Sequence, residues 1–271
     1  MRVAVSIAAV VGLCLVGVGV GVAQAPAPTV TVTVSESSIA VGATSPVAAG
    51  PTRFEVVSSD QNEAEVSIGA LRPGVTVDAF TAALRSGDPN EAIEMAHLDG
   101  GASLAAGQAS RAVTFSLRPS STYVAINLTG ENPADWEIAS FTTSDQANGA
   151  SAPQADARVN IFDLRFRGAK QLPRNGVVRF ENKGWAPHFA FAVPLKRGAK
   201  QRAVARALVR NANRPLERLL DFRNGVEAQS LITRGAADYN EIRFGKRGRY
   251  VMVCFFEGHN TQGMFRFVRV R

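Results

Sequence analysis

Short segments in which apolar and polar residues alternate recur along almost the whole chain. Alternation with a period of two places every second side chain on one face, which is typical of a half-buried β-strand. The segments lie at 29–34, 53–57, 64–68, 112–117, 123–128 and 136–142, and then at 159–166, 177–181, 188–193, 241–244, 249–256 and 264–270. Turn-forming residues separate them. The pattern therefore predicts an all-β protein built from antiparallel β-sandwiches.

The chain of 271 residues divides into two halves that resemble each other. Two pairs of short segments match, RFE at 53–55 with 179–181 and YVAI at 123–126 with YVMV at 250–253. Between these strands each half carries a helical pattern, at 77–85 and 90–97 in the first half and at 199–209 and 215–222 in the second. We therefore predict a duplicated domain, at 26–142 and 158–271, with a short helical insertion in each copy. The polar stretch 143–157 lacks large apolar residues and is predicted to be a linker.

The first 25 residues have the pattern of a targeting segment. Arg2 precedes the almost wholly apolar stretch 3–22, and Ala23-Gln24-Ala25 has small residues where a signal peptidase cleaves. We expect 1–25 to be a signal peptide and the protein to be exported, to the periplasm, the cell envelope or the extracellular space. An uncleaved membrane anchor is the alternative, because about 20 apolar residues are long enough to span a bilayer.

Cleavage would leave Cys254 as the only cysteine of the mature chain, because Cys14 lies in the targeting segment. Exported proteins usually pair their cysteines in disulfides. Cys254 is therefore a buried thiol, half of an intermolecular disulfide or a metal thiolate.

Charge is divided unevenly between the halves. Residues 26–150 carry 5 basic and 14 acidic side chains, for a net charge of −9, whereas 151–271 carry 24 basic and 9 acidic side chains, for +15. We expect the halves to attract each other across the linker and to separate as salt screens the attraction. The basic half also predicts an acidic partner protein, or contact with an anionic envelope or membrane surface. Nucleic acid is not expected as a partner of an exported chain.

Four side chains that suit a soft metal ion lie in the second half. Residues 180–188 (FENKGWAPH) end in His188, and residues 254–264 (CFFEGHNTQGM) contain Cys254, His259 and Met264. Two imidazoles and a thiolate in one plane with a weak axial thioether are the ligands of a blue-copper centre. Each of these residues alone is more often part of a core, but here they occur together. The chain has only three histidines, which argues against multicopper oxidase sites and zinc hydrolase clusters, because these need several histidine ligands for each metal centre.

At these two stretches the second half, about 158–271, resembles the cupredoxins, the family of plastocyanin and azurin. The stretch 180–188 is similar to the plastocyanin pattern around the first histidine ligand. The Cys-x₄-His spacing resembles that of azurin, and the His-x₄-Met spacing resembles that of plastocyanin. The resemblance implies an eight-stranded Greek-key sandwich that binds one copper ion. The implied ligands are His188, Cys254, His259 and Met264.

The sequence departs from the family pattern at three places. Plastocyanin-like sequences often have Asn after the first histidine and a hydroxyl residue after the cysteine, and these side chains connect the two ligand loops. Here the positions are Phe189 and Phe255, so we expect aromatic packing in place of that hydrogen bond. The 65 residues between His188 and Cys254 are more than plastocyanin has, and the helical insertion accounts for them.

The first half lacks the metal-binding residues. Aligning the halves at their matching segments places side chains that are poor copper ligands at all four positions, namely Asn62, Asn127, Asn132 and Glu137. We therefore predict that 26–142 is a degenerate cupredoxin-like domain without a copper site.

The resemblance implies one-electron transfer between Cu(I) and Cu(II), with a redox partner that the sequence does not identify. No nucleophile–base pair or open metal triad is visible in the sequence, so we do not expect an enzyme. Two alternatives stay open, a copper storage or delivery protein and a metal-free cupredoxin-like interaction module.

Overall fold

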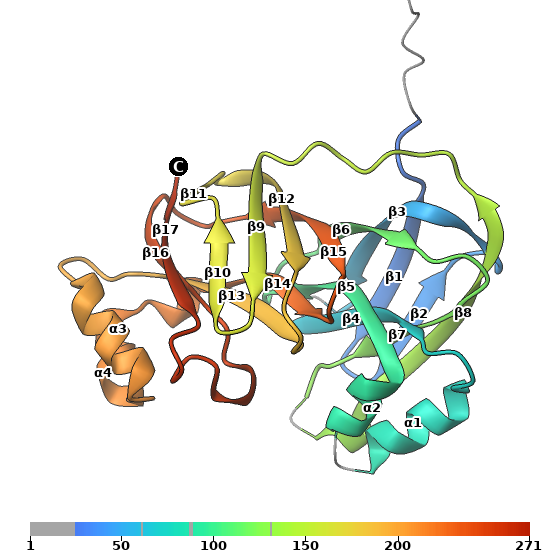
Figure 1. Cartoon of the computed structure of the whole chain (residues 1–271), viewed down its shortest axis with the longest axis horizontal. Coiled ribbons are helices and arrows are strands. Elements are labelled where there is room, and N and C mark those ends of the chain that lie inside the picture. Colours follow the sequence, from blue (N-terminus) through green and yellow to red (C-terminus); the bar gives the residue numbers. More distant parts are fainter. Residues whose placement is uncertain (1–24, 61, 87–88, 131) are drawn as a thin grey trace, which may run out of the picture.

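The computed structural model describes residues 25–60, 62–86, 89–130 and 132–271, and the two halves lie side by side (Figure 1). The prediction of an all-β fold with short helical insertions is confirmed. The first half contains β1 (Thr29–Ser35), β2 (Ser38–Gly42), β3 (Val47–Ser58), β4 (Ala64–Leu71), α1 (Val77–Arg85), α2 (Pro89–Met95), β5 (Ala96–Leu104), β6 (Ser110–Leu117), β7 (Thr122–Asn127), η1 (Pro133–Asp135) and β8 (Glu137–Ala147). The second half contains β9 (Ala157–Phe162), β10 (Arg165–Gly168), β11 (Gln171–Leu172), β12 (Asn175–Asn182), β13 (His188–Pro194), α3 (Gln201–Val209), α4 (Asn213–Leu219), η2 (Phe222–Asn224), β14 (Val226–Ile232), β15 (Ala237–Arg243), β16 (Gly248–Val253), η3 (Phe256–Gly258) and β17 (Phe265–Val270).

The first half is a sandwich of two layers. Strands β1, β2, β3 and β6 pair in one layer, and β8, β7, β4 and β5 pair in the other. Alternate side chains of β1 are buried, as its TVTVTV sequence predicts. Between the layers, the rings of Phe54 and Phe115 stack with centroids 4.7 Å apart. Helices α1 and α2 add a second apolar cluster with side chains of β4, β5 and β7.

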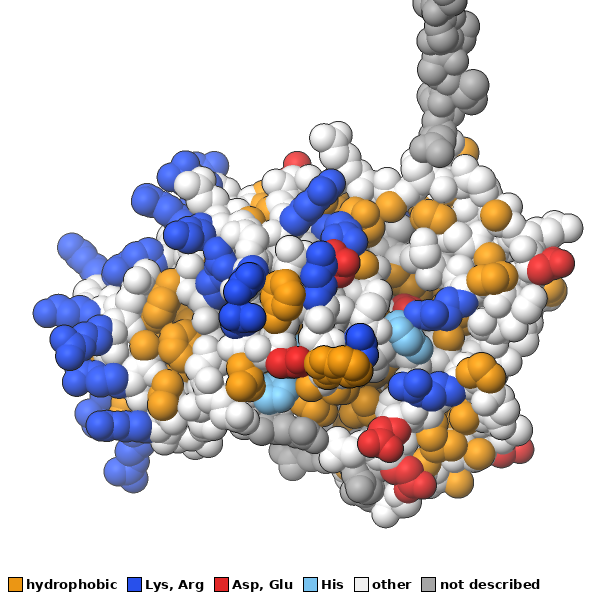
Figure 2. Space-filling view, viewed as in Figure 1, with side chains coloured by type: hydrophobic (Ala, Val, Ile, Leu, Met, Phe, Trp, Pro, Cys, Tyr) orange, Lys and Arg blue, Asp and Glu red, His pale blue; other side chains and the backbone are white. Residues whose placement is uncertain are grey.

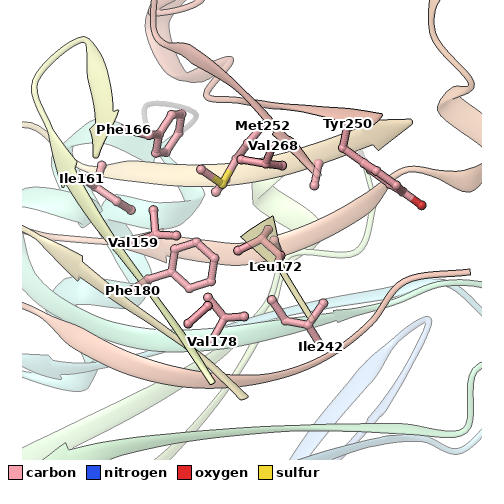
Figure 3. Close-up of a cluster of buried hydrophobic side chains, with 14 of the residues drawn as sticks. Val159, Ile161, Phe166, Leu172, Val178, Phe180, Ile242, Tyr250, Met252 and Val268 are labelled. Carbon is pink, nitrogen blue, oxygen red and sulfur yellow. The ribbon is translucent and has the colours of Figure 1, made fainter. Parts of the chain in front are cut away.

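The second half repeats this plan and contains the larger core, which includes Cys254 and Met264. Strands β10, β9, β12 and β15 form one layer, and β11, β17, β16, β13 and β14 form the other. Phe180, Leu172 and Met252 fill the space between them (Figure 3). Helices α3 and α4 connect β13 to β14 and bury their apolar sides with those of β13 and β16. Both halves thus carry a helix pair between two strands, as the sequence predicts.

A continuous sheet joins the halves. Strand β15 of the second half pairs antiparallel with β6 of the first, with Tyr239 opposite Thr114. Buried polar contacts follow the same boundary, among them Thr233 N–H to Leu98 O at 3.0 Å and Ser103 Oγ to a Glu227 carboxylate oxygen at 2.6 Å. Backbone pairing and desolvated polar groups therefore join the halves in addition to the attraction between their opposite charges, so separation at high salt is no longer expected.

Local structure differs from the sequence-based expectations at several places. The segment 159–166, expected as one strand, is two strands with a tight turn at Asp163 and Leu164, and Leu164 has a φ of +62°. Strands β2, β5, β11 and β14 were not predicted. The first residues of β5 overlap the helical pattern at 90–97, and the last three residues of β14 do not alternate in polarity. Strand β8 extends through residue 147, so the first five residues of the predicted linker are in a sheet.

The predicted signal peptide 1–25 lies almost entirely outside the described residues. In the described part of the chain, no helix has the length and apolar character to cross a membrane.

Candidate metal centre

Three of the four predicted ligands come together between two loops of the second half. The ligand atoms of His188, Cys254 and His259 all lie within 4.8 Å of one another. His188 begins β13, Cys254 follows β16, and His259 follows η3. The Sγ atom of Cys254 is 3.6 Å from Nδ1 of His259, and the two imidazole centroids are 4.9 Å apart. Residues from distant parts of the chain thus form one buried donor cluster.

His188 contributes a buried imidazole to this cluster. Its side chain is fully buried, and its Nε2 is 3.2 Å from a carboxylate oxygen of Asp163. A carboxylate accepts hydrogen bonds, so this contact places the proton on Nε2 and leaves the lone pair on Nδ1. Among the described residues, Nδ1 has no hydrogen-bond partner. Burial lowers the pKa of His188, and the charge of His259 acts in the same direction, against the raising effect of Asp163.

Asp163 connects three parts of the loop before β13. Its carboxylate accepts hydrogen bonds from the backbone N–H groups of Trp185 (2.9 Å) and Ala186 (3.1 Å) in addition to the His188 contact. Although burial acts to raise the pKa of Asp163, these hydrogen bonds lower it overall. Gly184 makes the approach feasible, because a Cβ there would lie 2.4 Å from the Asp163 carboxylate. Asp163 was not among the predicted site residues, and its only signal in the sequence is a turn within the segment 159–166.

The side chain of Asn182 orders the same loop from within. Its Nδ2 donates to Ala186 O and Ile232 O, each at 2.9 Å, and its Oδ1 accepts from Gly184 N–H at 2.9 Å. Both polar ends of this buried amide are therefore satisfied. These hydrogen bonds hold the loop that leads into His188 against β14.

Cys254 is a protected thiol. Burial raises the pKa of its thiol to about 11, although the backbone N–H groups of Phe189 and Phe256 donate to the sulfur and act to lower that pKa. Metal binding has to displace the proton, since the thiolate is the ligand form. The donation from Phe189 N–H also connects the His188 loop to the Cys254 loop. The side chains of Phe189 and Phe255 belong to different apolar clusters, so main chain rather than the expected aromatic packing supplies this connection.

The loop from Cys254 to Met264 closes on itself. Met264 N–H donates to His259 O at 2.9 Å, and Cys254 N–H donates to Met264 O at 3.2 Å. Gly258 and Gly263 take φ values of +75° and +97°, a region that favours glycine, and they allow the tight turns. Met264 is fully buried in the same core as Cys254. Its assignment as a metal ligand stays a prediction.

Asn260 connects this loop to the helical insertion. Its Nδ2 donates to Leu208 O at 3.1 Å and to Oδ1 of Asn211 at 3.3 Å, at the end of α3. Asn260 is buried and directly follows His259. The α3–α4 helix pair is therefore part of the support of the donor cluster, a role that the sequence did not reveal.

The donor set fits one thiophilic metal ion. Ligand atoms about 2.0–2.3 Å from a common ion lie roughly 3.5–4 Å apart, close to the spacing of the cluster. An imidazole nitrogen buried without a hydrogen-bond partner is otherwise costly, and coordination would satisfy it. His188, Cys254 and His259 can therefore hold one metal ion.

The corresponding positions of the first half have structural roles. Asn127 donates to Ser35 O at 2.8 Å and accepts from Thr129 N–H at 3.1 Å. Asn132 caps η1 by accepting from Ala134 N–H. The third histidine, His97, contacts Asp99 and the carbonyl oxygen of Arg234 instead of the donor cluster.

The comparisons with known proteins find similarity only among solved structures, since no protein-family model and no curated protein matches the chain. Auracyanin A, a "blue" copper protein of Chloroflexus aurantiacus, is 19% identical over 42% of this chain and 99% of its own, with a TM-score of 0.27. An azurin of Methylomonas sp. strain J is 16% identical over 45% of this chain and 99% of its own, with a TM-score of 0.26.

Some of the similar structures span both halves. A copper nitrite reductase of Nitrosomonas europaea is 11% identical over 90% of this chain and 93% of its own, with a TM-score of 0.27. At such identities and TM-scores, the evidence for a metal centre is the geometry of His188, Cys254 and His259.

Proposed function

We propose that this chain is an exported blue-copper protein of cupredoxin type that carries single electrons. His188, Cys254 and His259 would hold one copper ion, with Met264 as the weak axial ligand. The observation that carries the proposal is the meeting of two imidazoles and a thiol at one buried point, with the Nδ1 atom of His188 unsatisfied. Copper bound there would alternate between Cu(I) and Cu(II) and so take up and release one electron.

The protein supplies a site that does not need to rearrange. Asp163 holds the His188 ring, backbone N–H groups hold the Cys254 sulfur, and Asn260 holds the loop that bears His259. A soft sulfur ligand together with imidazole nitrogens, all held in place, suits both Cu(I) and Cu(II). Burial of His188 and Cys254 keeps bulk water from the ligand atoms. These features favour rapid electron exchange.

The same burial supports a carrier over an enzyme. His188 and Cys254 are fully buried and His259 is 7% exposed, so a substrate would have little access to a metal held between them. In the first half, the asparagine side chains of Asn127 and Asn132 make structural contacts at positions that correspond to ligands of the second half. This half would therefore bind no copper. We infer export from the targeting pattern of residues 1–25.

Copper titration tests the site directly. Addition of Cu(II) to the mature chain is expected to produce an intense visible thiolate-to-copper absorption band with one ion bound per chain. Cys254→Ser should abolish the band, because a hydroxyl oxygen cannot supply the covalent sulfur orbital. His97→Ala is the matched control and should keep the band. A colourless wild-type complex of normal stoichiometry would rule out the blue-copper proposal.

Reduction potential and self-exchange rate then separate a carrier from a store. A carrier needs a reversible one-electron couple and rapid exchange between Cu(I) and Cu(II) forms, whereas a storage or delivery protein needs neither. Copper content of protein purified from its own host distinguishes both from a metal-free interaction module.

A further inference from the structure

The outer side of the α3–α4 helix pair carries six basic side chains without a counter-ion. We call this surface the α3–α4 cationic face, and it consists of Lys200, Arg202, Arg206, Arg210, Arg214 and Arg218. All six are exposed, and in the described part of the chain none of them makes an ion pair or a side-chain hydrogen bond. Glu217 is the one acidic residue among 200–218. Figure 2 shows the basic side chains gathered at this end of the molecule.

The charges are placed against the local preferences of a helix. Arg202, Arg206 and Arg210 follow one another at intervals of four, so their like charges repel along one side of the helix. The first turns of α3 and α4 contain no acidic residue, and neither helix has a side-chain N-cap. Basic residues in the first turns oppose the helix dipole, whereas Arg206 and Arg218 lie in the last turns, where positive charge is favourable.

The helix pair of the first half provides an internal comparison. In α1 the Thr76 side chain accepts from Ala79 N–H, Asp78 lies in the first turn and Arg85 lies in the last. Helix α1 thus has the side-chain N-cap and the acidic first turn that α3 lacks, while both helices have an arginine in the last turn. Departures from local preference tend to mark functional surfaces, because the loss of stability has to be offset by another role.

The cationic face lies next to the donor cluster. Asn260, the residue after His259, is hydrogen-bonded to Leu208 and Asn211 at the end of α3. Arg249 binds Ala199 O at 3.1 Å and so fixes the start of the insertion to β16. A molecule bound to α3 and α4 would therefore sit beside the loop that bears His259.

The chemistry of the face favours carboxylates over lipid tails. Val209 is the one exposed large apolar side chain among the residues of α3 and α4, and the other apolar side chains pack against the sheet. A helix that binds in a bilayer interface buries an apolar side in it, and here that side is already occupied. Guanidinium groups form paired hydrogen bonds with carboxylates.

We propose that the α3–α4 cationic face is the docking surface for an acidic redox protein that exchanges one electron with the metal centre. The proposal rests on the proposed electron-transfer function. Docking places a carboxylate-rich surface on α3 and α4, and one electron then passes between the partner's redox group and the copper ion, with no proton transferred and no bond formed. Electrostatic steering should make the association fast at low salt and slow at high salt.

Poly-L-glutamate serves as the probe for docking, with the mature full-length chain in its copper-loaded and copper-free forms. We call the triple variant Arg202→Glu, Arg206→Glu, Arg210→Glu the hairpin variant, because all three changes lie on the α3–α4 helix pair. It is compared with the matched control Arg158→Glu, Lys170→Glu, Arg271→Glu. The control residues are exposed, make no side-chain ion pair in the described structure and change the net charge equally. We expect the hairpin variant to bind at least about tenfold more weakly than the control. Equal weakening of both would overturn the proposal, since total charge would then explain binding.

A kinetic experiment links docking to the metal. One electron passes from the Cu(I) protein to hexacyanoferrate(III), an anionic oxidant, or to tris(phenanthroline)cobalt(III), a cationic one. The hairpin variant should react about tenfold more slowly with the anion than the control and no more slowly with the cation. An equal rate in both variants would overturn the placement of docking beside the metal. The triple Arg→Gln variant of the hairpin should give a smaller change in the same direction.

Two further outcomes are informative. Vesicles of phosphatidylcholine and phosphatidylglycerol should not retain the protein at about 150 mM salt, and retention that the hairpin variant abolishes would assign the face to a membrane and overturn the proposal. If copper fails to bind, the copper-free glutamate experiment still reports on docking. Failure of the proposed function is therefore distinguishable from failure of the docking surface.

Discussion

Asp163 affects the metal centre without being among its predicted ligands. Its carboxylate touches the outer nitrogen of His188 and two backbone N–H groups of the preceding loop. A carboxylate behind a histidine ligand fixes the tautomer and makes the facing nitrogen a better donor. Asp163 is thus a positioning residue, and its effect should be measurable on copper affinity.

We expect Asp163→Asn to lower copper affinity about 10–100-fold while the fold is kept, because the amide retains one acceptor but loses the charge. Competition with a chelator of known affinity measures the change, and the reduction potential should shift with it. Asp156→Asn is the control, since the Asp156 carboxylate also accepts from a backbone N–H group, that of Val177, but has no hydrogen bond to a histidine in the described structure. Equal affinities of the two variants would contradict the positioning role.

Asp238 is a buried acid at the junction of the halves. Burial raises its pKa to about 8, against the hydrogen bonds from Gln229 and Asn240 and the charge of Arg111, while Asp99 adds to the rise. The folded protein therefore holds a proton that the unfolded chain releases above about pH 4. The stability that comes from this proton is complete below pH 4 and is lost as pH rises to about 8.

Denaturant unfolding across this pH range tests the prediction. Asp238 alone should reduce the free energy of unfolding by up to about 1.4 kcal/mol per pH unit. Asp238→Asn should remove that part of the slope, whereas the exposed Asp145→Asn should leave it in place. A wild-type slope that Asp238→Asn does not change would contradict the assignment.

At the scale of elements, the α3–α4 insertion and the metal loop behave as one unit. The Asn260 side chain connects them by bonds to Leu208 O and Asn211 Oδ1, and the carbonyl group of a buried residue loses a donor if the amide is removed. The helix pair is therefore more than an insertion between β13 and β14.

We expect Asn260→Ala to lower the free energy of unfolding by about 1–3 kcal/mol and to weaken copper binding, because two hydrogen bonds between the metal loop and the end of α3 are lost, at about 0.5–1.5 kcal/mol each. Chemical denaturation and copper titration measure the two effects. Asn224→Ala is the control, because the exposed Asn224 bonds only to Asp221 nearby, and its effect should stay within about 0.5 kcal/mol. Loss of stability with unchanged copper binding would separate the helix pair from the metal loop.

At the scale of the whole molecule, the continuous sheet determines how the halves respond to salt. Pairing of β15 with β6 places Asp238, Tyr239 and Asn240 beside residues of the first half. The Arg111 guanidinium reaches across to Ala228 O and to Asn240 Oδ1, each at 3.2 Å. Such buried contacts are screened by salt much less than surface charges are.

The radius of gyration is therefore expected to stay constant between about 10 mM and about 1 M salt. Small-angle scattering over this series checks it. Expansion at high salt would indicate that surface attraction rather than the shared sheet holds the halves together.

The sequence alone determined features that depend on short-range order. Alternating apolar residues specify strands, because burial of one sheet face requires a period of two. Cys254, His259 and Met264 fall on one short loop, so their nearness follows from the chain connection itself. The motif before β13 identified His188 by its resemblance to a known pattern, and the helix pair was visible as an interruption between two strands.

Tertiary structure decided whatever depends on contacts between distant segments. Asp163 precedes His188 by 25 residues and reaches it only because β9 pairs with β12 and the β9–β10 turn lies beside the loop. Asn260 is hydrogen-bonded to the end of α3, about 50 residues earlier in the chain, and β15 pairs with the edge of β6 in the first half. A local pattern predicts that a segment is a strand, but it does not identify the neighbouring strand or the hydrogen-bond partner of a side chain. The partner depends on the packing of the whole chain, because the free energies of strand pairing and of desolvation depend on which layers pack together.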